Sequence, residues 1–140
     1  MYQLNMTVKD EHIDFQGIVD GLYYPFYFEE CRHKFLQEVI GIDIAAYSKE
    51  GFNLVLVEYT LKFKKSLHKD DQFIVTCRLK GLSRSTFVAE QEILCNDKVA
   101  AIGTFTATCV PSAGGRLFIP EKIKQSMRAM ESEARVSIPR

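Results

Sequence analysis

The chain has 140 residues, carries 18 basic and 18 acidic side chains, and is 46% hydrophobic. This length predicts one domain, residues 1–140, with a sizeable core, and the apolar content excludes an intrinsically disordered chain. A formal net charge of zero favours neither a nucleic-acid partner nor an anionic membrane surface.

Cysteine usage and the N-terminus indicate a cellular compartment. The four cysteines form no Cys-x-x-Cys pair, so neither a zinc site nor a redox motif is expected. The N-terminus has no basic region followed by an apolar run, and no apolar run reaches the length of a membrane span. Together these features predict a protein of the reducing cytoplasm, without a membrane segment.

The first elements are a strand, a loop and a long helix. Apolar and polar residues alternate from Tyr2 to Val8, which predicts a half-buried strand, and a loop follows over residues 10–21. A helical period then runs from Leu22 to Ile40, with Gly41 as its stop. The inward stripe of this helix is predicted to hold Tyr24, Phe28, Cys31, Phe35 and Val39.

Aromatic residues surround the front half of the helix, including Tyr23, Phe26 and Tyr27, which predicts burial on most sides. The charged back half, which contains Arg32 and His33, is expected to reach solvent or a subunit boundary.

Four strand patterns follow, at residues 57–64, 73–80, 86–95 and 99–110. The short turns between them favour antiparallel neighbours. Pro120 opens a short amphipathic helix that ends near Met130, and residues 131–140 are predicted to form a frayed tail. A five-stranded antiparallel sheet wrapped around the long helix buries both, which predicts an α+β fold. The open face of such a sheet predicts pairing with a second copy.

The loop before the long helix carries the clearest chemical signal. Asp14 lies on a loop turned by Gly17, just ahead of the predicted helix start. A carboxylate in this place can act as a general base or a nucleophile on an acyl compound. Unpaired backbone N–H groups at the helix start can bind the oxyanion that forms. On spacing alone, however, an Asp in a loop is more often a turn residue, and Asp20 is read as the cap of the helix.

This loop and the order of elements resemble the hotdog fold, and more narrowly the 4-hydroxybenzoyl-CoA thioesterase type of acyl-CoA thioesterase. The early pattern of that family is Asp-x-x-Gly-[Ile/His]-Val, followed by Tyr and then Phe-Glu-x-x-Arg. It is matched without a gap by Asp14, Gly17, Ile18, Val19, Tyr24, Phe28, Glu29 and Arg32. The chain departs from its relatives at Ile13, Asp20, Gly21 and Tyr23, which flank the expected acyl pocket, so the acyl group stays open.

The resemblance implies hydrolysis of a coenzyme A thioester to a free acid and coenzyme A, with no metal or cofactor. Asp14 would attack the thioester carbonyl or activate water, and Gly17 would turn the backbone beside it. The backbone N–H groups of Gly21 and Leu22 would hold the oxyanion. The acyl pocket would be lined by Tyr24, Tyr27 and Phe28, although residues of this kind are as often core as pocket.

The resemblance also implies an assembly and a nucleotide site. A homodimer, and a homotetramer built from it, would place the phosphates of coenzyme A at a subunit boundary. The basic residues expected to meet them are Arg84, ranked first because it lies in a turn between two strands, and Lys62, Lys64, Lys65 and Arg116.

Two other functions stay open. The lysines at 62, 64 and 65 keep open a thioesterase for acyl carrier protein, although such residues most often form a solvated strand face. A non-catalytic acyl-CoA binding module would need an output domain, and 140 residues leave no room for a DNA-binding helix-turn-helix. His12 is read as a solvated loop residue more often than a proton carrier, and His68 as a surface residue. Cys31, on the inward stripe, is not expected to be a nucleophile.

Overall fold

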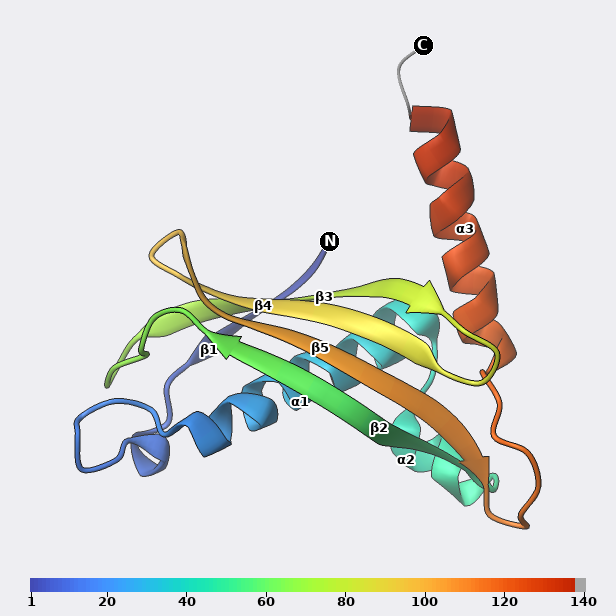
Figure 1. Cartoon of the computed structure of the whole chain (residues 1–140), viewed down its shortest axis with the longest axis horizontal. Helices are drawn as coiled ribbons and strands as arrows, with labels where there is room; N and C mark the ends of the chain where they lie inside the picture. Colours follow the sequence, from blue (N-terminus) through green and yellow to red (C-terminus); the bar gives the residue numbers. More distant parts are fainter. Residues whose placement is uncertain (138–140) are drawn as a thin grey trace.

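Five strands form one antiparallel sheet in the computed structural model, which describes residues 1–137. They are β1 (Tyr2–Thr7), β2 (Phe52–Phe63), β3 (Gln72–Leu82), β4 (Phe87–Cys95) and β5 (Lys98–Pro111). Their order across the sheet is β1-β3-β4-β5-β2, so β1 and β2 are its two edges (Figure 1). Short turns join β3 to β4 and β4 to β5, which confirms the predicted antiparallel pairing.

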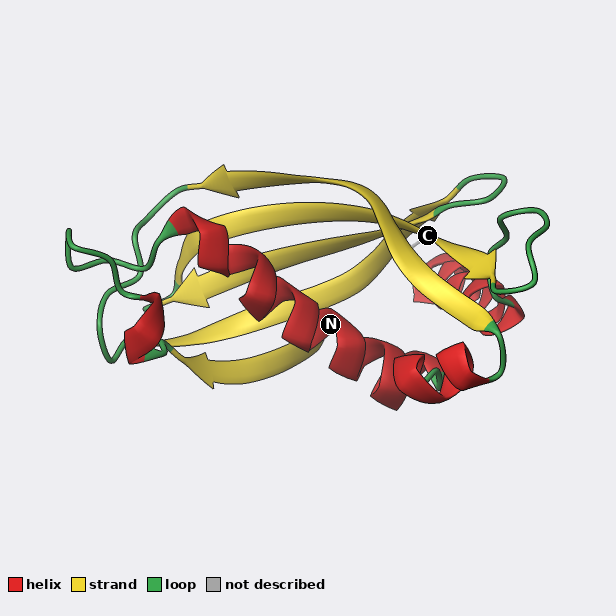
Figure 2. Ribbon diagram, turned by 90° about the horizontal axis from the view of Figure 1, so that it is seen from below, coloured by secondary structure: helices red, strands yellow, loops and turns green. Residues whose placement is uncertain are grey.

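The long helix α1 (Tyr24–Phe35) runs across one face of the curved sheet (Figure 2). It follows a short 3-10 turn, Gly21–Tyr23, where Asp20 Oδ1 accepts a hydrogen bond from the Leu22 N–H at 2.9 Å. Pro25 lies in the first helical turn, in which its missing N–H costs little. Asp20 therefore caps the turn that leads into the helix, and the α-helix itself begins two residues after the predicted start.

Aromatic rings join α1 to the sheet. The ring of Phe28, which is fully buried, lies 5.3 Å from that of Phe105 on β5. The ring of Tyr27 stands edge-on to Phe73 of β3 at 5.0 Å. Burying one side chain of this size is worth about 3 kcal/mol. This core, enclosed between sheet and helix, confirms the predicted α+β architecture.

The end of the long helix departs from the predicted stripe. A π turn, Leu36–Ile40, follows α1, and the N–H of Gly41 donates to the carbonyl oxygen of Leu36, five residues back, at 2.8 Å. The wider turn rotates the following residues away from the regular helical period. Ile40 is buried, and Val39, which was predicted to lie inside, is 54% exposed. Gly41 ends the helix as predicted, with a φ of 89°.

One charged residue of the back half of α1 is buried, against the prediction. Arg32 is 6% exposed, and its guanidinium lies 4.3 Å from the centre of the Phe105 ring. Its Nη1 donates to Gln91 Oε1 at 3.0 Å, and Gln91 Nε2 donates to the Phe28 carbonyl oxygen at 2.9 Å. Burial lowers the pKa of Arg32. A ring face and an amide therefore hold this cation in the core.

Other boundaries differ from the sequence prediction by several residues. Region 44–52 contains a short helix, α2 (Ile44–Lys49), and β2 begins at residue 52 rather than 57. The last helix, α3 (Glu121–Ser137), continues past Met130 through most of the predicted tail, of which residues 138–140 lie outside the described part. Within residues 1–137, no helix is long and apolar enough to cross a membrane.

The edge strand β2 exposes apolar side chains. The strand predicted at residues 57–64 is present up to Phe63, but the expected alternation of burial is not: Val57, Tyr59 and Phe63 are exposed in the single chain. Phe26 of α1 was predicted to be buried, yet it is 57% exposed and lines a small pocket together with Tyr59. An edge strand also leaves backbone N–H and C=O groups unpaired, so the β2 edge of a single chain can still pair with another strand.

Candidate active site

Asp14 begins a tight three-residue hairpin loop. Its N–H donates to the Ile18 carbonyl oxygen at 2.9 Å, and the Gly17 N–H donates to the Asp14 carbonyl oxygen at 3.0 Å. Gly17 has a φ of 83°, the left-handed conformation that closes such a loop and that residues with a Cβ avoid. The Asp-x-x-Gly spacing is therefore the spacing of this turn, with the carboxylate at its first position.

One oxygen of the Asp14 carboxylate is held within the loop. Oδ1 accepts a hydrogen bond from the Gln16 N–H at 2.8 Å. Among residues 1–137, Oδ2 has no hydrogen-bond donor, and Asp14 is only partly exposed. The turn role and the chemical role are therefore compatible, because the contact that stabilises the loop also orients the carboxylate.

Backbone pairing fixes the hairpin to the core. Ile13 and Val19 bridge its two arms, and the Val19 N–H donates to the Leu67 carbonyl oxygen at 2.9 Å. Ile18 bridges His68, so the segment after β2 becomes a third strand beside the hairpin. Because Val19 and Leu67 are buried, the Asp14 loop rests on the hydrophobic core.

One of the two backbone donors predicted for the oxyanion is already used. The Leu22 N–H donates to Asp20 Oδ1, and the Tyr23 N–H donates to the Asp20 carbonyl oxygen at 2.9 Å. In the described part of the chain, the Gly21 N–H has no hydrogen-bond acceptor. The structure therefore leaves Gly21 as the available donor and gives Leu22 a part in the helix cap.

A pocket of about 280 Å³ lies beside Gly21. Its walls come from the hairpin, the helix start and the end of β2: Ile18, Val19, Gly21, Tyr24, Phe63, Lys64, Lys65 and Ser66. A Cβ added to Gly21 would lie 3.6 Å from Cζ of Phe63, so this glycine faces the phenyl ring directly. Asp14 does not line the pocket in the single chain and adjoins it through Ile18, its partner across the hairpin.

Tyr24, one of the three side chains predicted to line an acyl pocket, lines this pocket. Its ring is edge-on to Phe63 at 5.0 Å, and its hydroxyl accepts a hydrogen bond from the Leu67 N–H at 3.2 Å. Burial raises the pKa of Tyr24. Tyr27 and Phe28 lie in the core between α1 and the sheet instead, because the inward stripe of the helix carries them there.

The predicted coenzyme A residues fall into two groups. Lys64 and Lys65 line the pocket, and Lys62 lies at the same end of β2. Arg84 follows β3 and Arg116 follows β5, at the sheet end where Phe52 pairs with Pro111. The length of β2, about 36 Å at 3.3 Å per residue, separates the two ends. Within one chain, the structure does not bring Arg84 or Arg116 to this pocket.

His12 is packed rather than solvated. Its Nδ1 lies 2.7 Å from the Tyr27 hydroxyl oxygen, and its ring stacks on Tyr23 with centroids 4.2 Å apart. Sequence reasoning missed this contact because 15 residues separate the two partners and no period relates them. Cys31, as expected, is not poised for nucleophilic attack, since burial raises the pKa of its thiol to about 12.

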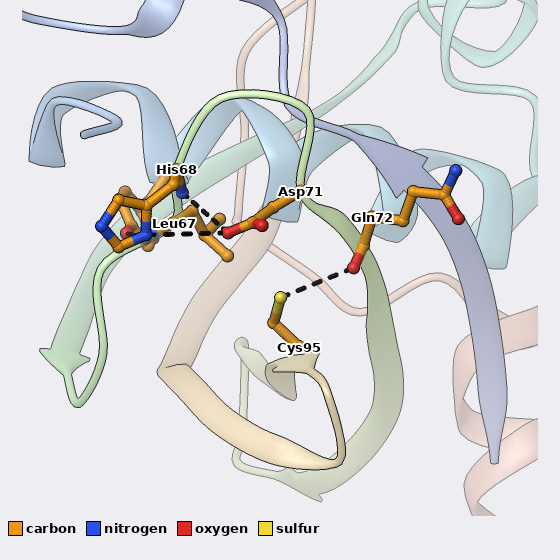
Figure 3. Close-up of polar contacts among 6 residues, drawn as sticks. Leu67, His68, Asp71, Gln72 and Cys95 are labelled. Carbon is orange, nitrogen blue, oxygen red and sulfur yellow. Dashed lines mark hydrogen bonds and ion pairs between the residues drawn. The ribbon is translucent and has the colours of Figure 1, made fainter. Parts of the chain in front are cut away.

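His68 and Asp71 form a second polar cluster that sequence reasoning missed (Figure 3). The His68 N–H donates to Asp71 Oδ2 at 2.8 Å, and the same oxygen lies 3.8 Å from Nδ1 of the imidazole. His68 is a surface residue, as predicted, but its pairing with Ile18 places it beside the Asp14 hairpin. The only sequence signal was the turn composition of residues 69–71.

Known proteins match most of the chain. The family described as the thioesterase-like superfamily matches residues 8–134. A putative esterase of Aquifex aeolicus is 32% identical over 115 residues, which cover 82% of this chain and 88% of that protein. The chloroplastic acyl-acyl carrier protein thioesterase ATL3 of Arabidopsis thaliana is 34% identical over 82 residues, 59% of this chain and 43% of its own length. The chain spans about half the length of the curated plant relatives that it matches.

A solved structure confirms the fold at low identity. The DHNA-CoA thioesterase of Staphylococcus aureus has a TM-score of 0.85 and 17% identity, over 98% of this chain and 95% of that chain. The predicted hotdog arrangement is therefore confirmed. Because the family match extends over residues 8–134, the chain belongs to the thioesterase-like superfamily.

Proposed function

We propose that the chain hydrolyses an acyl-coenzyme A thioester to the free acid and coenzyme A. One observation carries this proposal: Gly21, whose N–H is unpaired, lines a pocket together with Ile18, the hairpin partner of Asp14, whose carboxylate is oriented by the loop. The similar protein of Staphylococcus aureus is described as a thioesterase for a coenzyme A ester, which supports the choice of thiol.

In the proposed reaction, Asp14 attacks the thioester carbonyl carbon or takes a proton from a water that does so. The carbonyl oxygen becomes an oxyanion that accepts a hydrogen bond from the Gly21 N–H. Loss of one such donor raises the barrier by about 3–4 kcal/mol. Collapse of the tetrahedral intermediate breaks the C–S bond and releases coenzyme A. In the water route this leaves the free acid, and in the nucleophilic route a water then hydrolyses the acyl–Asp14 anhydride to the free acid and restores the carboxylate. These steps require no metal or cofactor.

The proposal includes a homodimer formed through the β2 edge, with a homotetramer built from it. The exposed apolar residues of β2, the unpaired edge and Phe26 support such an interface. If two β2 strands pair antiparallel about a twofold axis, the Phe52 end of one lies beside the Phe63 end of the other. Arg84 and Arg116 of the second copy would then approach the pocket mouth, where coenzyme A phosphates are expected.

A carrier-protein thioesterase is the second candidate. The Arabidopsis relative is described as acting on acyl-acyl carrier protein, and Lys64 and Lys65 line the pocket. Lys62 extends this basic border and would face an acidic carrier. A non-catalytic acyl-CoA binding module is the third candidate, and the position of Asp14 beside the pocket argues against it. For the cell compartment we propose the cytoplasm, on the pattern of four free cysteines.

The test is a thiol-release assay on a panel of aliphatic and aromatic acyl-CoA esters and on the same acyl groups carried by acyl carrier protein. We expect release from at least one acyl-CoA, with a higher kcat/KM than from the matching carrier-protein ester. A preference for the carrier protein would support the second candidate. Binding of acyl-CoA without any thiol release would contradict the proposed hydrolysis.

A further inference from the structure

We infer that His68, oriented by Asp71, donates the proton to the thiolate that leaves during the hydrolysis. The inference rests on the proposed function, because it needs a thioester whose carbonyl lies between Asp14 and Gly21. It adds a second catalytic residue, supplied by the segment after β2, which no sequence motif identified.

Backbone pairing places His68 in line with Asp14. Ile18 accepts the Asp14 N–H at 2.9 Å on one side and bridges His68 on the other. Residues opposite one another in antiparallel strands project to the same face, and adjacent residues project to opposite faces. Val19 and Leu67, which form the adjacent row, are buried. The row of Asp14, Ile18 and His68 therefore faces outward.

The span of this row suits one thioester group. Three adjacent strands at about 4.8 Å spacing place the Cα atoms of Asp14 and His68 about 10 Å apart. Both side chains extend from the same face, so a group lying over Ile18 has the carboxylate on one side and the imidazole on the other. Ile18 also lines the pocket that contains Gly21. The residues that lead into His68, Phe63 to Ser66, form a further wall of that pocket.

The Asp71 carboxylate lies beside the imidazole of His68 (Figure 3). Its Oδ2 binds the His68 N–H at 2.8 Å and faces Nδ1 at 3.8 Å, so Nε2 points away from the carboxylate. The Asp71 N–H donates to the His68 carbonyl oxygen at 3.1 Å, and the Val8 N–H donates to the Asp71 carbonyl oxygen at 3.0 Å. The turn is thereby tied to the end of β1. The His68 side chain is 63% exposed, so Nε2 is accessible to a substrate.

The proton balance is complete. In the water route, Asp14 takes one proton from the attacking water, and the C–O bond forms. When the intermediate collapses, the C–S electron pair moves to sulfur, which takes the proton from Nε2 of the protonated His68. The free acid and the thiol of coenzyme A are released. The proton on Asp14 returns through solvent to His68, and no further reactant is required.

The test varies the leaving group. A general acid matters for an alkyl thiolate of high basicity and matters little for a weakly basic aryl thiolate. We therefore compare kcat for an acyl-CoA and for the thiophenol ester of the same acid, in the native protein and in His68→Gln. We expect kcat on acyl-CoA to fall about 100-fold and kcat on the thiophenol ester to stay within about twofold. Asp71→Asn, which keeps an oxygen for the His68 N–H, is expected to show a smaller loss with the same selectivity.

His33→Gln is the matched control, because His33 also faces a carboxylate, Glu29 Oε1 at 3.6 Å, but lies on α1. We expect native rates from it on both esters. If His68→Gln and His68→Asn each lose the same fraction of kcat on the two esters, the role of His68 is structural and the inference is overturned. Native rates of the two variants on acyl-CoA would overturn it as well. If the native protein releases no thiol from either ester, the proposed function fails, and the inference about His68 fails with it.

Discussion

Nδ1 of His12 lies 2.7 Å from the hydroxyl oxygen of Tyr27, a hydrogen bond that joins the Asp14 loop to the buried helix. The same hydroxyl accepts the Lys9 N–H at 3.5 Å, so it links two residues of the segment before Asp14 to the helix. His12 is two residues from Asp14, and its ring stacks on Tyr23. The position of the carboxylate therefore depends on a side chain of the core.

Tyr27→Phe is expected to lower the free energy of unfolding by about 1–2 kcal/mol, because it leaves Nδ1 of His12 without its partner. Urea unfolding measures the change. Tyr23→Phe is the control: the Tyr23 hydroxyl makes no hydrogen bond within residues 1–137, so the stack survives and stability stays within about 0.5 kcal/mol. Equal effects from the two variants would contradict this role of the Tyr27 hydroxyl.

Gly17→Ala is expected to destabilise the protein by about 1–2 kcal/mol through backbone strain alone. Gly17 has a φ of 83°, and an added Cβ would meet nothing within 4 Å. Gly81→Ala provides a matched control, since its Cβ also meets nothing within 4 Å and its φ is not left-handed. Thermal unfolding of both variants separates strain from crowding. If Gly17→Ala were as stable as Gly81→Ala, the turn would not need a left-handed residue.

Gln91→Leu is expected to cost about 3 kcal/mol of unfolding free energy. The change removes the acceptor of Arg32 Nη1 and the donor to the Phe28 carbonyl oxygen, and it leaves a buried cation with fewer partners. Gln37→Leu, on the exposed side of the π turn, is the control and is expected to change stability by less than about 0.5 kcal/mol. Chemical unfolding curves at neutral pH compare them. A neutral effect of Gln91→Leu would show that the ring of Phe105 alone satisfies Arg32.

The stability contributed by Glu90 is expected to depend on pH. A hydrogen bond from Arg78 and the approach of Lys80 at 3.3 Å lower the pKa of Glu90 below its ordinary value. A lowered carboxyl pKa stabilises the folded state above the unfolded pKa of about 4.3, and the gain is lost as pH falls through the folded pKa.

Glu90→Gln is therefore expected to be less stable than the native protein at pH 7, by less than about 1 kcal/mol because the pair is partly exposed, and equally stable at pH 2. Glu92→Gln, on the same strand, is the control, and unfolding curves at both pH values give the difference. A gap between Glu90→Gln and the native protein that persists at pH 2 would contradict the ionic origin of the effect.

Local pattern predicted much of the fold. The buried positions Tyr24, Phe28, Cys31 and Phe35 follow the helical period, and the strand alternation followed from burial on one face. The period failed at Val39 because a π turn changes the spacing, and a π turn has no marked composition. The acyl-pocket roles of Tyr27 and Phe28 came from the family resemblance rather than from the period, and they stay a prediction, with both side chains buried in the core.

The candidate site was predicted where its chemistry and its turn coincide in sequence. Asp14 and Gly17 form one local loop, so four residues were sufficient to identify it. Contacts between distant segments were not accessible: His12 with Tyr27, and Ile18 with His68, depend on the packing of loop, helix and the end of β2. Arg84 was ranked first among the basic residues because of its turn, and only the sheet register shows that it lies at the far end.

The central claim is that the Asp14 carboxylate carries thioester hydrolysis. The most direct measurement is the rate of thiol release from the best acyl-CoA of the panel by the native protein, by Asp14→Asn and by Asp43→Asn, the last a helix-cap aspartate of α2. Asn at position 14 keeps an oxygen for the Gln16 N–H, so the loop is expected to survive. We predict a loss of about 100-fold or more for Asp14→Asn and a native rate for Asp43→Asn. A native rate from a folded Asp14→Asn would contradict the claim.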